Sequence, residues 1–125
     1  MKTIIAGSRT INSMEILLQA IKESKFEITS VISGMARGVD SLAVDYAKET
    51  NLPLVKMPAF WDLYGRSAGY KRNEQMAEVA DALIALWDGS SRGTKHMIDI
   101  AKKKGLKVFI YIPDNLRQPR TIEWN

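Results

Sequence analysis

Short apolar runs alternate along the chain with stretches in which apolar residues recur every three or four positions. The runs predict β-strands, and the recurring positions predict amphipathic helices. Strands are expected at residues 2–6, 28–32, 53–57, 82–87 and 107–112. Helices are expected at residues 13–23, 39–50, 68–79 and 94–104, with a short turn at 62–65.

Capping signals mark the ends of two of these helices. Asn12 followed three residues later by Glu15 predicts a capping box at the start of the first helix. Gly105 follows the last helix and is expected to close it. The loops between helices and strands can therefore be placed along the chain.

The strands are apolar almost throughout, which is typical of a parallel sheet covered on both faces. Right-handed crossovers then predict an α/β fold with a single Rossmann-like, doubly wound parallel sheet of five strands, with helices on both faces. The expected strand order is 3-2-1-4-5. Residues 1–113 are expected to form one domain, and the polar residues 114–125 a C-terminal tail whose packing the pattern leaves open.

The composition narrows the chemistry that this domain can perform. The chain has 125 residues, a net charge of +4, no cysteine and one histidine, His96. Disulfides, thiolate metal sites, thiol nucleophiles and a pair of histidine ligands are excluded, and no metal site is expected. The charge suits an anionic partner such as a nucleotide, a phosphate, a nucleic acid or an acidic surface.

Membrane association and secretion are not expected. No apolar run approaches the ~20 residues of a membrane span. The apolar stretch in residues 1–7 is too short for a signal peptide. We therefore expect a cytoplasmic protein.

Glycine, serine and arginine gather where four of the five predicted strands end. Ligands of such sheets bind beyond the carboxyl ends of the strands. The candidate ligand-binding residues are Gly7, Ser8, Arg9, Ser33, Gly34, Arg37, Trp61, Arg72, Asn73, Asp88, Gly89, Ser90, Gly93 and Thr94.

These residue types suit a phosphate or a ribose. Glycine lets the backbone approach a ligand closely, and arginine donates paired hydrogen bonds to phosphate oxygens. Gly93 and Thr94 begin a predicted helix, so their amides are expected to cradle a phosphate. Neither the dinucleotide-binding nor the P-loop glycine spacing is present. Tight turns with solvated arginines, and a loop capped by Thr94, are the plainer alternatives.

Three further features have two interpretations each. Asp40 either caps the helix at 39–50, which we favour, or accepts from a ribose hydroxyl. His96, in the first turn of the predicted helix, is either solvated or half-buried, which we favour, or it hydrogen-bonds a ligand or shuttles a proton. The aromatic residues Phe60, Trp61 and Tyr64 either stack on a nucleobase or plug the end of the sheet.

Taken together, these residues resemble the SLOG superfamily of nucleotide-binding proteins over about residues 3–112. The similarity is greatest to the stand-alone YspA-type SLOG family of bacteria and phages. It rests on six segments in order, at residues 7–9, 33–40, 58–61, 65–69, 72–76 and 93–94. The resemblance implies a Rossmann-like fold, a nucleotide-derived ligand that includes signalling nucleotides, and a homo-oligomer.

Two other branches of the superfamily are also similar. Residues 33–40 resemble DNA-processing protein A, which binds single-stranded DNA. Residues 72–97 resemble the LONELY GUY phosphoribohydrolases, with their arginine at Arg72 and their glycine-threonine pair at Gly93-Thr94. Their glutamate falls on Met97, which has no acid-base group. Asp99 lies roughly 200° around the helix from Met97 and is a poor substitute.

We therefore expect the chain to bind a nucleotide or nucleotide-derived ligand rather than to hydrolyse it, with no other cofactor. A phosphoribohydrolase or other nucleotide-hydrolysing enzyme is the first alternative, with Asp88, His96 and Asp40 as candidate catalytic residues. Single-stranded DNA binding is the second alternative, supported by the net charge. Because arginines lie on the strand-end loops while most lysines lie elsewhere, a local anion pocket is favoured over a diffuse basic surface.

Overall fold

The computed structural model describes residues 1–113 and 122–124, which contain a six-stranded sheet in the order β3-β2-β1-β4-β5-β6. The strands are β1 (Lys2–Gly7), β2 (Ser30–Ser33), β3 (Leu54–Lys56), β4 (Ala82–Leu86), β5 (Lys107–Tyr111) and β6 (Ile122–Trp124). The first five are parallel, so the predicted α/β class and the order 3-2-1-4-5 are confirmed.

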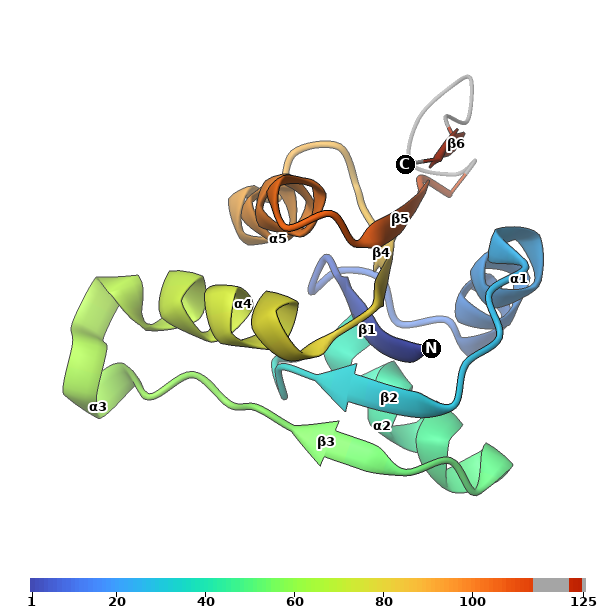
Figure 1. Ribbon diagram of the computed structural model, residues 1–125, viewed down its shortest axis with the longest axis horizontal. Coiled ribbons are helices and arrows are strands. Elements are labelled where there is room, and N and C mark those ends of the chain that lie inside the picture. The colour runs from blue at the N-terminus through green and yellow to red at the C-terminus, as the bar shows by residue number, and fades with distance from the viewer. Residues whose placement is uncertain (114–121, 125) are drawn as a thin grey trace.

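Helices cover both faces of the sheet (Figure 1). They are α1 (Met14–Ser24), α2 (Val39–Thr50), α3 (Trp61–Tyr64), α4 (Ala68–Val79) and α5 (Arg92–Lys103), with a 3-10 turn, η1 (Gly65–Ser67), between α3 and α4. Helices α1 and α2 pack on one face, and α4 and α5 on the other. Among the described residues, none of these helices is long and apolar enough to cross a bilayer.

The strands are apolar at successive positions because both sides of the sheet are buried. Neighbouring residues of a strand point to opposite faces. In β1, Ile4 packs with the α4–α5 side and Ile5 with the α1–α2 side, and in β4 Leu83 and Ile84 divide in the same way. All four side chains are 0% exposed, so burial on both faces accounts for the continuous apolar runs.

β1 lies at the centre of the sheet and determines where a crevice forms. It pairs with β2 along one edge and with β4 along the other. The chain leaves β1 towards β2 and β3 and then returns to β4, so the strand order reverses beside β1. α1 follows β1 and α5 follows β4, and these helices pack on opposite faces. A crevice at the carboxyl ends of β1 and β4 is the expected consequence.

Three predicted helix features are corrected by the structure. α1 is capped by Ser13 rather than Asn12, because the Ser13 hydroxyl accepts the Ile16 amide at 3.3 Å. α5 begins at Arg92, two residues before the predicted start, so His96 lies beyond the first turn. The predicted turn at 62–65 is formed by α3 and η1. Gly105, with a φ of +81°, follows α5 as predicted.

A sixth strand comes from the region that the sequence analysis treats as a tail. β6 pairs antiparallel with β5, with Glu123 opposite Ile110. Residues 114–121 and 125 lie outside the described residues. The domain boundary at residue 113 stays a prediction.

Gly7 is the position where β1 cannot carry a side chain. A Cβ there would overlap the carbonyl oxygen of Leu86 and lie 2.8 Å from Cγ2 of Val39. We predict that Gly7→Ala lowers the free energy of unfolding by about 2 kcal/mol or more, because the backbone of β4 cannot move without breaking the sheet. Urea denaturation followed by circular dichroism measures this change.

Gly93→Ala is the matched control, because a Cβ at Gly93 meets nothing within 4 Å. Gly93 is helical, so this substitution is expected to keep or raise the free energy of unfolding, by up to about 1 kcal/mol. A Gly7→Ala protein as stable as the wild type would contradict the close contact between β1 and β4.

Candidate functional site

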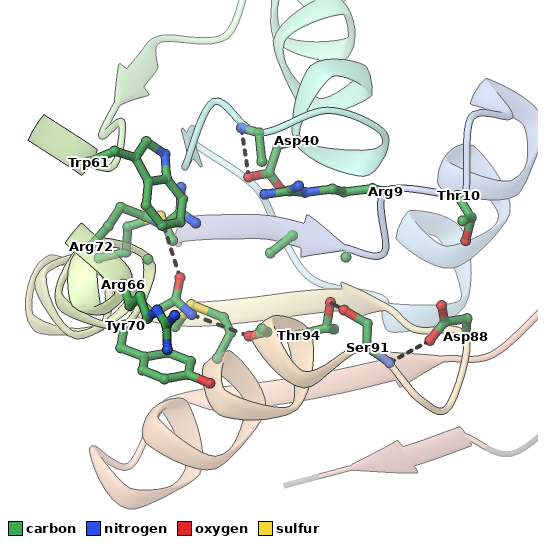
Figure 2. A pocket seen from close by; sticks show the side chains of 18 residues that line it. Arg9, Thr10, Asp40, Trp61, Arg66, Tyr70, Arg72, Asp88, Ser91 and Thr94 are labelled. Atoms are coloured by element: carbon green, nitrogen blue, oxygen red, sulfur yellow. Dashed lines mark hydrogen bonds between the residues drawn. The ribbon is translucent and has the colours of Figure 1, made fainter.

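A cavity of about 430 Å³ opens at the carboxyl edge of the sheet, between the strand ends and helices α4 and α5 (Figure 2). Its walls come from the end of β1 and the loop that follows it, the loop after β2 and the start of α2. The other walls are α3, η1, α4, the loop after β4 and the first turns of α5. The structure brings together these residues that the sequence analysis singled out: Gly7, Arg9, Asp40, Trp61, Arg72, Asn73, Asp88, Gly93 and Thr94.

The other sequence candidates lie outside the lining of this cavity. They are Ser8, Ser33, Gly34, Arg37, Gly89, Ser90 and His96. Arg37 is exposed on the loop before α2. Several of the others hold the cavity wall in place through hydrogen bonds.

Two buried serines tie the loops of the site together. The Ser8 amide donates to the carbonyl of Leu86 at 3.0 Å, and the Ser8 hydroxyl accepts the amide of Asp88 at 3.0 Å. The Ser33 hydroxyl donates to the carbonyl of Asp40 at 3.0 Å and accepts the amide of Met35 at 3.1 Å. Ser8 and Ser33 are 1% and 0% exposed, so these hydroxyls shape the loops.

Arg72 reaches from α4 to the loop after β2. Its guanidinium donates to the carbonyl of Gly34, and its Nε donates to Oδ1 of Asn73 at 3.0 Å. A Cβ at residue 34 would lie 2.8 Å from Cζ of Arg72, which explains the glycine there. Burial lowers the pKa of Arg72, and the nearby carboxylate of Asp40 opposes this. An arginine stays charged in proteins, so the cavity wall contains a fixed cation.

Asn73 connects α4 to the start of α5. Its Nδ2 donates to the carbonyl of Gly93 at 3.3 Å and lies 3.2 Å from Nδ1 of His96. The His96 ring also packs against Tyr70, with 4.4 Å between the ring centroids. His96 is therefore half-buried behind the wall of the cavity, as the favoured interpretation predicts.

Asp40 is buried and bonds the loop before its own helix. Its Oδ2 accepts the amide of Ala36 at 3.2 Å. The predicted helix cap is wrong, because the N-cap of α2 is Gly38 and no side chain caps it. Burial raises the pKa of Asp40, although hydrogen bonding and the charges of Arg72 and Arg9 partly oppose the rise.

The loop between β4 and α5 is organised around Asp88. Oδ1 of Asp88 accepts the amides of Ser90 and Ser91, both at 2.8 Å. Partial burial raises the pKa of Asp88, but these hydrogen bonds outweigh it and hold the pKa below its ordinary value. Two amides of this loop are thus already bonded. The amides of Gly93 and Thr94 lie in the first turn of α5, where backbone amides have no acceptor within the helix, and both residues line the cavity.

The aromatic residues near α3 do not fill the end of the sheet. Neither α3 nor η1 has a buried residue, and Phe60 and Trp61 are both 53% exposed. Trp61 instead lines the cavity. This corrects the plug interpretation and leaves the indole ring available to a ligand.

Several lining residues were not among the candidate ligand-binding residues, although Arg66 was one of the strand-end arginines that favoured an anion pocket. They are Ala6, Thr10, Ala36, Arg66, Gly69, Tyr70, Met76, Ser91 and Met97. Gly69 and Met76 could have been predicted from helical spacing. Together with the candidates Arg72 and Asn73 they lie on one face of α4, and this face lines the cavity. Thr10 and Ser91 carry no pattern of this kind.

We predict that Asn73→Ala lowers the free energy of unfolding by about 1–3 kcal/mol, because the Gly93 carbonyl, the His96 ring and Nε of Arg72 each lose a partly buried hydrogen-bond partner. Chemical denaturation measures the change. Gln75→Ala, at an exposed position of the same helix, is the control and is expected to change stability little. Equal stability of the two variants would contradict the role of Asn73 in joining α4 to α5.

Asp40 makes stability depend on pH. Its pKa is higher in the folded protein than in the unfolded chain, so the folded protein takes up this proton first as the pH falls. Protonation of Asp40 therefore raises the free energy of unfolding at acid pH. This contribution is lost as the pH rises through the raised pKa of Asp40. We predict that the free energy of unfolding of the wild type, relative to Asp40→Asn, increases between about pH 7 and about pH 4. A flat or falling difference would contradict the burial of this carboxyl.

Comparison with known proteins supports the family resemblance. The profile of the YspA, cpYpsA-related SLOG family matches residues 1–64. "Gene 61 protein" of Mycobacterium phage D29 is 30% identical over 117 residues, which cover 86% of this chain and 93% of the phage protein. The resemblance inferred from the motifs is confirmed. The chain belongs to the YspA, cpYpsA-related SLOG family.

Proposed function

We propose that this protein binds a nucleotide or nucleotide-derived ligand in the cavity at the carboxyl edge of the sheet. One observation carries the proposal: three arginines from separate segments line a single cavity. Arg9 follows β1, Arg66 lies in η1 and Arg72 lies in α4. The family and the Rossmann-like sheet are compatible with such a ligand.

The start of α5 supports a phosphate among these arginines. The amides of Gly93 and Thr94 lie in the first turn, where the helix dipole favours an anion. Arg9 and Arg66 are exposed, so their guanidinium groups are accessible to an entering ligand. Arg72 is held by Gly34 and needs no rearrangement before binding. Amides and guanidinium groups together match the oxygens of a phosphate.

The aromatic side chains support a base or another flat ring beside the phosphate. Trp61 and Tyr70 line the cavity and are 53% and 45% exposed. Exposed aromatic rings stack on nucleobases with little regard to base identity. The volume of about 430 Å³ lies within the range of small-molecule sites.

Hydrolysis of the ligand is the second candidate function, and Asp40 is the observation that favours it. A carboxyl whose pKa is raised by burial in a cavity wall has the protonation behaviour of a general acid. Met97 argues against hydrolysis of the LONELY GUY type, because it lines the cavity where that pattern has its glutamate. Binding without hydrolysis therefore remains the first proposal.

Single-stranded DNA binding and self-association stay predictions. Convergence of arginines on one cavity suits a small ligand better than an extended strand, which needs a groove along its backbone.

Arg66→Ala tests the proposed site most simply. Arg66 is exposed and lines the cavity, so its loss is expected to weaken nucleotide binding about tenfold without lowering stability. Calorimetric titration with a panel of nucleoside phosphates measures the affinity, after thermal-shift screening has selected the tightest ligand. Arg37→Ala is the control, because Arg37 is also exposed but lies outside the cavity lining.

Two outcomes would count against the proposed site. Equal weakening by Arg66→Ala and Arg37→Ala would indicate general attraction to a basic surface. Failure of every nucleotide in the screen to stabilise the protein at millimolar concentration would contradict nucleotide binding itself.

Product analysis separates binding from hydrolysis. Nucleoside monophosphates incubated with the protein are expected to be recovered intact by chromatography, with no free base. Release of free base by the wild type, lost in Asp40→Asn, would contradict this expectation and establish the second candidate function.

A further inference from the structure

The two ends of the cavity carry different chemistry (Figure 2). Trp61, Arg66 and Arg72 gather at one end. At the other end lie Asp88, Ser91 and Thr10, away from Arg66 and Arg72. The first end suits an anion and a flat ring. The second presents two hydroxyls and a carboxylate, and Thr94, in the first turn of α5, lies between the two ends.

Asp88 is held in one position by its own loop. Oδ1 accepts the amides of Ser90 and Ser91 at 2.8 Å and the hydroxyl of Ser90 at 3.3 Å. A carboxylate offers about four lone-pair sites on its two oxygens, so these bonds leave capacity on Oδ2. The hydroxyl of Ser8 also helps to lower the pKa of this carboxyl. The cavity therefore contains an ionised acceptor whose position is set before a ligand arrives.

The loop itself is also anchored to the rest of the fold. The indole nitrogen of Trp87 donates to the carbonyl of Ser91 at 3.1 Å, and the hydroxyls of Ser91 and Thr94 lie 3.1 Å apart. These contacts tie Asp88 to β4 on one side and to the first turn of α5 on the other. A ligand group that binds here meets a rigid acceptor, so a matching hydrogen-bond donor binds without the cost of ordering the loop.

A fixed carboxylate repels a phosphate and accepts hydrogen bonds from hydroxyls. Like charges brought together at a binding site reduce affinity, whereas a hydroxyl bound to a carboxylate gains a charge-assisted hydrogen bond. In a nucleotide, the 2′ and 3′ hydroxyls of the ribose donate such bonds, and so do the amino groups of the bases. The exposed ring of Trp61 favours the base at the other end of the cavity, which leaves the ribose to Asp88. In dinucleotide-binding folds an acidic residue beyond the first βαβ turn accepts from the ribose.

The acidic residue after β2 is poorly placed for this task here. Asp40 is 4% exposed, and its Oδ2 is bonded to the amide of Ala36. Asp88 is only partly buried and lines the cavity after β4. Of these two carboxylates, Asp88 is therefore the better placed to accept a hydrogen bond from a ligand.

We propose that Asp88 accepts the 2′ hydroxyl of the ligand's ribose and so selects ribonucleotides over 2′-deoxyribonucleotides, with the phosphate directed towards the arginines. This inference rests on the proposed function and adds the class of nucleotide. Thr10 and Ser91 line the same end of the cavity and provide further hydroxyls for the same group.

The test compares matched pairs of ligands by calorimetric titration. The probes are the four common ribonucleoside 5′-monophosphates and their 2′-deoxy counterparts. The wild type is expected to bind its tightest ribonucleotide at least about tenfold more tightly than the matched deoxyribonucleotide, because a site built around a ligand hydroxyl discriminates against its absence.

Asp88→Asn separates a direct contact from a structural role. The asparagine Oδ1 can still accept the amides of Ser90 and Ser91, but the charged acceptor is lost. This variant is expected to bind the ribonucleotide about tenfold more weakly while its affinity for the deoxyribonucleotide stays within about threefold of the wild type. Asp99→Asn is the control, because Asp99 lies on α5, pairs with Lys95 and is outside the cavity lining.

Each remaining outcome overturns a specific claim. Equal binding of the two sugar types by the wild type, with binding still weakened by Arg66→Ala, overturns the ribose inference and keeps the proposed function. An equal loss for both sugar types in Asp88→Asn assigns Asp88 to the loop alone and also overturns the inference. Binding of no nucleotide at all overturns both.

Discussion

The close contact between the ends of β1 and β4 is the constraint on which the site depends. Gly7 has no side chain because the carbonyl of Leu86 occupies that space, and Ser8 bonds both Leu86 and Asp88. These contacts hold the ends of two central strands together while the helices that follow them pack on opposite faces. The cavity lies where the segments after β1 and β4 diverge towards opposite faces of the sheet, as expected at the switch point of a doubly wound sheet.

Hydrogen bonds made by two residues of α4 then hold a positively charged side chain in the wall of this cavity. Arg72 bonds the loop after β2, and its neighbour Asn73 bonds the first turn of α5 through the carbonyl of Gly93. One turn of α4 thus joins two loops that are far apart in the sequence. The same contacts place a cation and the amides of a helix start on one cavity, which favours an anionic ligand without a large rearrangement.

The sheet could be predicted from the sequence because each parallel strand is buried on both faces and is apolar at successive positions. β6 could not, because it lies among the polar residues 114–125 and its described interaction is backbone pairing with β5. The site was only partly predictable. Glycine and arginine at strand ends indicated Gly7 and Arg9, but a serine that bonds a loop, such as Ser33, looks the same in sequence as one that binds a ligand. The exposed position of Trp61 depends on how the segment after β3 leaves the sheet, which no local pattern specifies.

The central claim is that a nucleotide occupies this cavity, and backbone and indole NMR shifts on titration with the best ribonucleotide test it most directly. The account predicts that the largest shifts fall on the amides of Gly93 and Thr94 and on the indole of Trp61, all of which line the cavity. Shifts concentrated instead in the groove between α1 and α2, around Leu18 and Tyr46, would contradict it.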